Sequence, residues 1–174
     1  MLNITYATEC IGGAGLLALG LIDRSTRDID VVALRRGAEL VDPDPLPPTL
    51  LEARDRVADD FDLPREWLNT APASLLDLGL PEGFADRLER RAHGPALTVW
   101  LASRVDQIHF KLYALADQAA GSKHDLDLRE LEPTRVELLT PARWTITHDP
   151  SPGFQQELLR ALAHLGVEDA DLGR

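Results

Sequence analysis

The sequence has few cysteines, few aromatic residues and few basic residues for its length. Cys10 is the only cysteine among 174 residues, which excludes an intrachain disulfide and an all-cysteine metal site and is typical of a reducing cytoplasm. Three Trp, two Tyr and four Phe are too few for an aromatic platform that stacks single-stranded nucleic acid. The net charge of -11 argues against a surface that binds nucleic acid non-specifically. An RNA partner therefore requires a local basic patch.

Long apolar runs are also lacking. No stretch approaches the roughly twenty apolar residues of a membrane span, and the start of the sequence lacks the pattern of an export signal. A hydrophobic content of 44% with 27% charged residues is typical of a globular domain with a buried core. We expect a cytoplasmic protein without a membrane partner.

The N-terminal part predicts a strand, a glycine turn, a helix and a second strand. Residues 4–11 alternate loosely and contain β-branched side chains before the pair Gly12 and Gly13. Residues 14–21 favour a short buried helix, and the β-branched residues of 28–34 favour a strand in the core.

The middle of the chain begins with a proline-rich segment. Four prolines within 42–48 exclude a helix and a central strand there. Helical spacing follows in 50–61, with Thr49 as its predicted cap. We further expect a charged helix over 81–91 and a third strand over 97–102.

The C-terminal part predicts only helices, over 104–120, 123–132, 134–147 and 152–165. The fold class expected is therefore α/β in the α+β sense. A small mixed sheet flanked by helices would occupy residues 1–103, and a helical C-terminal lobe would occupy residues 104–174.

Two aspartates form the first candidate site. Asp28 and Asp30 stand at i and i+2 of the predicted strand, so their carboxylates leave the same side of the sheet. Two like charges at this distance repel unless a cation lies between them, and Mg²⁺ prefers such oxygen ligands. The alternative is a pair of solvated aspartates at a strand edge. Gly12 and Gly13 favour close approach of the backbone to phosphate, and also fit an ordinary turn.

Several segments together carry a family resemblance. They are IGGAGLLALGLIDRSTRDIDVVAL, HFKLYALAD, SKHDLDLRELEPT and ARWTITHDPSPGF. In this combination the chain resembles the nucleotidyltransferase superfamily, in its small bacterial branch related to AbiEii and MenT toxin-type enzymes. The resemblance covers most of the chain except roughly residues 35–95.

The resemblance implies roles for five residues of the N-terminal part. Asp28 and Asp30 match the carboxylates that bind the metal, expected to be Mg²⁺. Thr26 matches a hydroxyl residue just ahead of them, and Gly12 and Gly13 match the glycine turn at the nucleotide.

The resemblance also implies roles in the C-terminal part. Lys111 matches a lysine expected to neutralise nucleotide phosphate, and the alternative is a surface lysine whose stem covers the helix. Lys123 and Asp127 belong to a second matching segment. Asp127 could orient Lys111, accept a proton or only solvate its helix. Asp125 points about 200° away from Asp127 on a helix, so at most one of the two faces a shared site.

The implied activity is the transfer of a nucleoside monophosphate from a nucleoside triphosphate. The acceptor in that branch is the 3′ end of tRNA, and the enzyme is a toxin with a cognate antitoxin. The basic patches available for RNA are Arg24 with Arg27, or a set on the predicted charged helix that consists of Arg87, Arg90 and Arg91. An acidic protein is also compatible with a protein or a cationic small molecule as the acceptor.

The sequence departs from the family pattern at one point. Many nucleotidyltransferases carry a third carboxylate on a later strand, and the predicted strand over 97–102 has none. Three alternatives follow: Asp106 or Asp127 substitutes from a helix, a single metal ion suffices, or the domain binds a nucleotide or a partner without catalysis.

Overall fold

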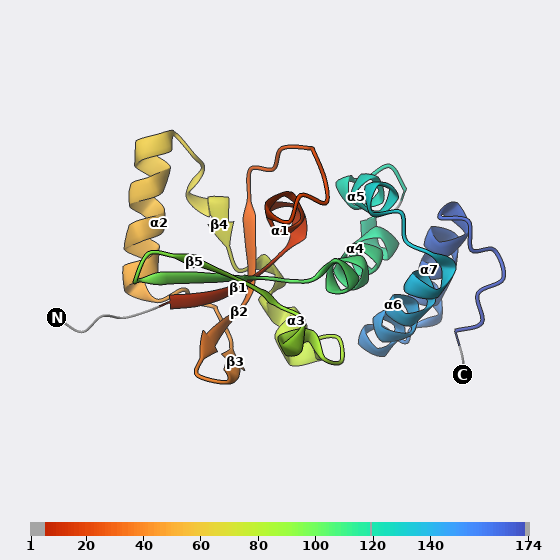
Figure 1. Ribbon diagram of the computed structural model, residues 1–174. Helices are drawn as coiled ribbons and strands as arrows, with labels where there is room; N and C mark the ends of the chain where they lie inside the picture. Colours follow the sequence, from red (N-terminus) through yellow and green to blue (C-terminus); the bar gives the residue numbers. More distant parts are fainter. Residues whose placement is uncertain (1–5, 119, 173–174) are drawn as a thin grey trace. The chain divides into compact units, whose positions relative to one another are not determined.

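The computed structural model describes residues 6–118 and 120–172 (Figure 1). The chain divides into two compact units, Met1–Ser103 and Arg104–Arg174. The first unit holds the sheet and three helices, and the second consists of helices, so the mixed α/β class expected from the sequence is confirmed. Within the described part of the chain, no helix has the length and hydropathy that crossing a lipid bilayer requires.

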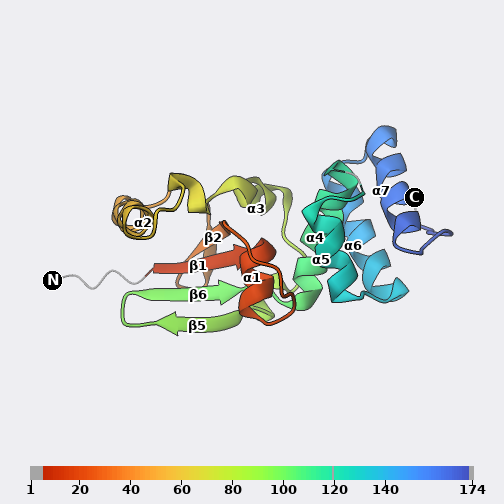
Figure 2. The same ribbon diagram turned by 90° about the horizontal axis from the view of Figure 1, so that it is seen from above.

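The sheet of the N-terminal unit is mixed. Its six strands are β1 (Tyr6–Ile11), β2 (Ile29–Arg36), β3 (Glu39–Val41), β4 (Leu68–Asn69), β5 (Glu89–His93) and β6 (Leu97–Leu101). Five of them follow the order β3-β2-β1-β6-β5, and β4 pairs with β2. The central strand β1 is antiparallel to β2. It is parallel to β6, as the arrows of these two strands in Figure 2 show.

The register places different kinds of side chain on the two faces of the sheet. Cys10 pairs with Val31, and both belong to the apolar core cluster. The next pair, Ile11 with Asp30, therefore points to the opposite face, because side chains alternate along a strand. The apolar face and the candidate metal ligands thus lie back to back on the same strands.

Helices of the N-terminal unit are short except for one. They are α1 (Gly12–Ala18), α2 (Pro48–Phe61) and α3 (Ser74–Leu78), with 3-10 turns at η1 (Arg65–Trp67), η2 (Ala71–Ala73) and η3 (Phe84–Asp86). The predicted cap of α2 is wrong: Pro47 holds the N-cap position without a side-chain cap, and Thr49 lies inside the first turn. Pro48 begins the helix because its fixed φ suits this position.

The charged helix predicted over 81–91 is wrong. Gly83 takes a left-handed φ of 71°, η3 is a single turn, and Glu89–His93 forms strand β5. This strand pairs antiparallel with β6, so long-range backbone hydrogen bonds override a local helical pattern. Arg90 and Arg91 are adjacent on a strand and point to opposite faces, so the proposed basic helix face does not exist.

Four helices make up the described part of the C-terminal unit: α4 (Arg104–Gln118), α5 (Lys123–Leu131), α6 (Arg135–His148) and α7 (Pro152–His164). Helix α4 packs against the other three. The Ser122 side chain caps α5, and Thr134 with Glu137 forms a capping box at α6. Leu126 of α5 is 56% exposed, whereas Leu128 and Leu131 are buried.

Candidate active site

The two aspartates of the candidate site lie where strand β2 begins. Asp28 stands just before the strand and Asp30 within it, and both are half-buried. The Thr26 hydroxyl donates to Asp28 Oδ1 at 2.7 Å, and the Asn69 side-chain amide donates to Asp30 Oδ1 at 3.0 Å. Each carboxylate is therefore held in one orientation by a neutral donor from outside strand β2.

Gly12 lies directly against Asp30. A Cβ atom at Gly12 would lie 2.5 Å from Asp30 Oδ2, and the glycine φ is +81°. Real Cβ atoms essentially never approach another heavy atom so closely, so only glycine fits here without a shift. The glycine turn after β1 and the carboxylate on β2 therefore form one constellation.

Gly13 brings the same turn against residues of the loop before β2. A Cβ atom at Gly13 would lie 2.9 Å from Arg24 Nη2 and 3.3 Å from Thr26 Oγ1. The Arg24 guanidinium thus places a positive charge beside the turn. All five site residues predicted in the N-terminal unit come together. Gly12 lies against Asp30, and Gly13 lies against Thr26, whose hydroxyl donates to Asp28.

The chemistry of the aspartate pair fits a hard divalent cation. Asp28 and Asp30 offer carboxylate oxygens, which Mg²⁺ prefers. Among the described residues, no group of three or more His, Cys, Asp or Glu side chains is arranged to hold a metal ion. A cation here would thus complete its coordination with substrate phosphate and water.

Strand β6, which lies beside β1, supplies no third carboxylate. Ala102 follows β6 directly, and its backbone N–H donates to the Cys10 carbonyl at 3.0 Å. An acidic residue of this sheet that was not considered in the sequence analysis is Glu9 on β1. It is fully buried, and Arg35 Nε donates to Glu9 Oε1 at 2.8 Å.

Glu9 has an unusual protonation equilibrium. Burial raises the pKa of its carboxyl from 4.5 to about 7, although the hydrogen bond and charge of Arg35 act in the opposite direction. The Arg35 guanidinium in turn lies 4.5 Å from the centre of the Trp100 ring. An acidic residue inside the otherwise apolar and neutral segment ITYATECI is the signal that could have identified it.

Lys111 forms a buried ion pair within the C-terminal unit. Its Nζ lies 2.6 Å from Asp127 Oδ2, and the two side chains are 3% and 0% exposed. The alternative of a surface lysine on α4 is therefore wrong. Of the three roles considered for Asp127, the geometry favours orientation of Lys111, because a carboxylate at this distance fixes the ammonium group.

The other acidic residue of α5 has different partners. Asp125 accepts from the backbone N–H of Gly121 at 2.9 Å and from Arg129 Nε at 3.0 Å, and its Oδ2 lies 2.8 Å from His164 Nε2. Despite its burial, these partners lower the pKa of its carboxyl. Asp125 and Asp127 thus belong to separate clusters, as the helix geometry predicts. Lys123 is exposed at the first position of α5.

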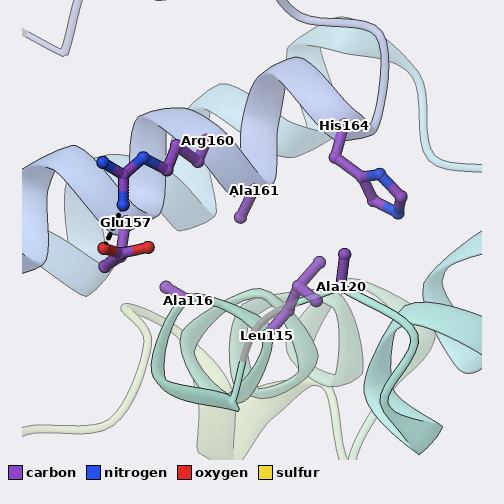
Figure 3. A pocket seen from close by; sticks show the side chains of 7 residues that line it. All are labelled: Leu115, Ala116, Ala120, Glu157, Arg160, Ala161 and His164. Atoms are coloured by element: carbon purple, nitrogen blue, oxygen red, sulfur yellow. Dashed lines mark hydrogen bonds and ion pairs between the residues drawn. The ribbon is translucent and has the colours of Figure 1, made fainter.

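A pocket of about 190 Å³ lies between α4 and α7 of the C-terminal unit (Figure 3). Leu115, Ala116 and Ala161 face one another across it, and the Arg160–Glu157 ion pair stands at one end. His164, at the other end, is held by Asp125. Arg160 and His164, at the two ends of the pocket, are thus paired with acidic residues of the same unit. We assign this pocket no role in the predicted chemistry.

Two residues of the N-terminal constellation were missed as site residues. Asn69 has no role in the sequence analysis, and it reaches Asp30 through the pairing of β4 with β2. Arg24 was considered only as part of an RNA-binding patch.

Comparisons with protein-family models, with curated proteins and with solved structures gave no match to the chain. The geometry of the N-terminal unit and the resemblance in the sequence are therefore the indications of function.

Proposed function

We propose that the protein is a Mg²⁺-dependent nucleotidyltransferase of the cytoplasm, which transfers a nucleoside monophosphate from a nucleoside triphosphate to an acceptor hydroxyl. The observation that carries this proposal is the close approach of Gly12 to Asp30. It joins a glycine turn to two oriented carboxylates, which is the combination that nucleotidyl transfer needs.

The reaction is an in-line displacement at the α-phosphorus. The acceptor hydroxyl loses its proton to water, its oxygen forms a bond to the α-phosphorus, the bond from phosphorus to the bridging oxygen breaks, and pyrophosphate leaves. Bound Mg²⁺ would supply Lewis-acid polarisation of the phosphate and a lower pKa of the acceptor hydroxyl. Asp28 and Asp30 would hold the ion, and Thr26 and Asn69 keep their carboxylates in place. Arg24 would neutralise phosphate charge beside the glycine turn.

The resemblance also implies a nucleotide contact for residues of the C-terminal unit. The ammonium group of Lys111 is buried within that unit and paired with Asp127 at 2.6 Å, so the proposal rests on the residues of the N-terminal unit.

The proposed acceptor is the 3′ end of tRNA, with the chain acting as a toxin that a cognate antitoxin controls. The basic side chains that support RNA contact are Arg24 and the exposed Arg27 in the loop before β2. The net charge of -11 opposes RNA elsewhere and supports a protein or a cationic small molecule as the alternative acceptor.

The test is incorporation of label from each of four α-labelled nucleoside triphosphates, with Mg²⁺ and total tRNA or cell lysate. We expect transfer by the wild type and a loss of at least about a hundredfold for Asp28→Asn and Asp30→Asn. Asp59→Asn is the matched control, because Asp59 is an exposed aspartate of α2 that pairs with Arg65. Equal labelling by Asp30→Asn and wild type would reject the metal chemistry.

A second candidate function is a nucleotidyltransferase-like domain that binds a nucleotide or a partner without catalysis. It is favoured by the lack of a third metal-ligating side chain beside the aspartate pair among the described residues. Calorimetric binding of a nucleoside triphosphate without any transfer would support this candidate. Transfer that depends on Asp30 would reject it.

A further inference from the structure

An open groove crosses the apolar face of the sheet in the N-terminal unit. Two hollows, of about 190 and 360 Å³, share the lining residues Cys10, Ile29 and Val99 and therefore adjoin each other. Both lie on the face opposite to Asp30, since Ile29 and Asp30 are neighbours on one strand. The groove is thus separate from the candidate active site.

Helices border the groove on two sides, and strands of the sheet form its floor. Helix α2 lines the smaller hollow with residues that include Leu50, Ala53 and Val57. Helix α1 lines the larger one with Ala14, Gly15 and Ala18, which are too small to fill it. Both helices lie on the same side of β1 in Figure 1.

The floor of the groove is chemically inert. Cys10 is 3% exposed, and burial raises the pKa of its thiol to about 12, so it stays neutral and acts as an apolar residue. Its Sγ lies 3.8 Å from the Thr8 hydroxyl. The remaining floor residues, which include Leu97 and Val99, are aliphatic.

Basic side chains lie at both ends of the groove, but they differ in how firmly they are paired. Arg91 and His93 stand on the edge strand β5, are exposed, and line the larger hollow. Arg91 Nη2 lies 3.2 Å from Glu89 Oε2, and both side chains are about half exposed, so water weakens this pair. At the other end, Arg54 is bound through two nitrogens to Asp55.

We propose that this groove binds a medium-chain carboxylate, with its carboxylate at Arg91 and His93 and its hydrocarbon chain across the strands toward α2. The lining spans four neighbouring strands, β5, β6, β1 and β2, or about 14 Å at the usual strand spacing. A carboxylate complements the basic edge of an otherwise acidic protein, and the aliphatic floor complements its chain.

The test is calorimetric titration of the full chain with monomeric decanoate, with decanol and decyltrimethylammonium as probes of charge. We expect one decanoate per chain and binding at least about tenfold weaker for both other probes. Arg91→Ala should weaken decanoate binding about tenfold. Arg90→Ala is the matched control, because this neighbour points to the opposite face of β5 and should leave binding unchanged.

A second pair of variants tests the hydrocarbon end. Ala14→Phe fills the larger hollow and Ala53→Phe the smaller one, and either should abolish binding in protein that retains its wild-type circular dichroism spectrum. No decanoate binding by the wild type would overturn the proposal. Equal losses from Arg90→Ala and Arg91→Ala, or decanol binding as tightly as decanoate, would overturn it as well. None of these outcomes depends on nucleotidyl transfer.

Discussion

The ammonium group of Lys111 and the carboxylate of Asp127 form an ion pair at 2.6 Å with almost no access to water. A buried pair of this kind contributes little compared with two apolar residues, but removal of one partner leaves an uncompensated charge. Because Lys111 lies on α4 and Asp127 on α5, loss of either partner should destabilise the contact between these two helices.

The first prediction concerns this pair. Lys111→Met should lower the free energy of unfolding by about 3–5 kcal/mol, and Lys111→Met with Asp127→Leu should recover a large part of that loss. Denaturant unfolding of both variants checks this. The control is Arg160→Met, which breaks an exposed pair with Glu157 and should cost less than about 1 kcal/mol. Equal costs for the two single changes would contradict a buried-charge effect.

The second prediction concerns the contact between Gly12 and Asp30. Gly12→Ala places a methyl group against Asp30 Oδ2 and should displace that carboxylate, so transferase activity should fall by at least about tenfold. Gly37→Ala is the control, since Gly37 also has a positive φ, of +65°, but nothing lies within 4 Å of its Cβ position. It should lose only about 1 kcal/mol of unfolding free energy, with activity retained. Similar activities of the two variants would show that Gly12 is needed only for its φ.

The third prediction concerns the orientation of Asp30. Asn69→Ala removes the amide that donates to Asp30 Oδ1, so a higher Mg²⁺ concentration should be needed for half-maximal transfer, by about threefold to tenfold. A Mg²⁺ titration of transfer measures this shift. Thr70→Ala, which removes a hydroxyl bonded to the exposed Asp44 instead, should leave the midpoint unchanged.

The fourth prediction is a pH dependence of stability due to Glu9. Its pKa is about 7 in the folded protein against 4.5 in the unfolded chain, so between these values the folded state binds more protons. Stability from this group is thus greatest below about pH 4.5 and falls by up to about 3 kcal/mol as the pH rises to 7. Glu9→Gln should remove this fall. Unfolding curves at several pH values test it, and parallel curves for variant and wild type would contradict it.

Most elements of the N-terminal unit could be predicted because their signals are local. The β-branched run that begins near Ile29 and the turn at Gly12 are readable in the sequence. Strand β5 could not be predicted, because its side chains are all exposed and its formation depends on pairing with β6. The short strands β3 and β4 depend in the same way on β2.

The candidate site was predictable in part for a similar reason. Residue types and spacing identify Asp28 and Asp30, but the contact between Asn69 and Asp30 joins residues 39 positions apart in the chain. The burial of Glu9 likewise follows from its place on the central strand, since that position is set by partners on both sides. No local pattern encodes such contacts.

The alternation of side chains at the start of β2 has one more consequence. Ile29 faces the groove, while the residues before and after it carry the two carboxylates. A side chain at position 29 that shifts the backbone of the strand moves both acidic neighbours as well. Substitutions at position 29 should therefore be limited by the positions that Asp28 and Asp30 must keep, as well as by packing in the groove.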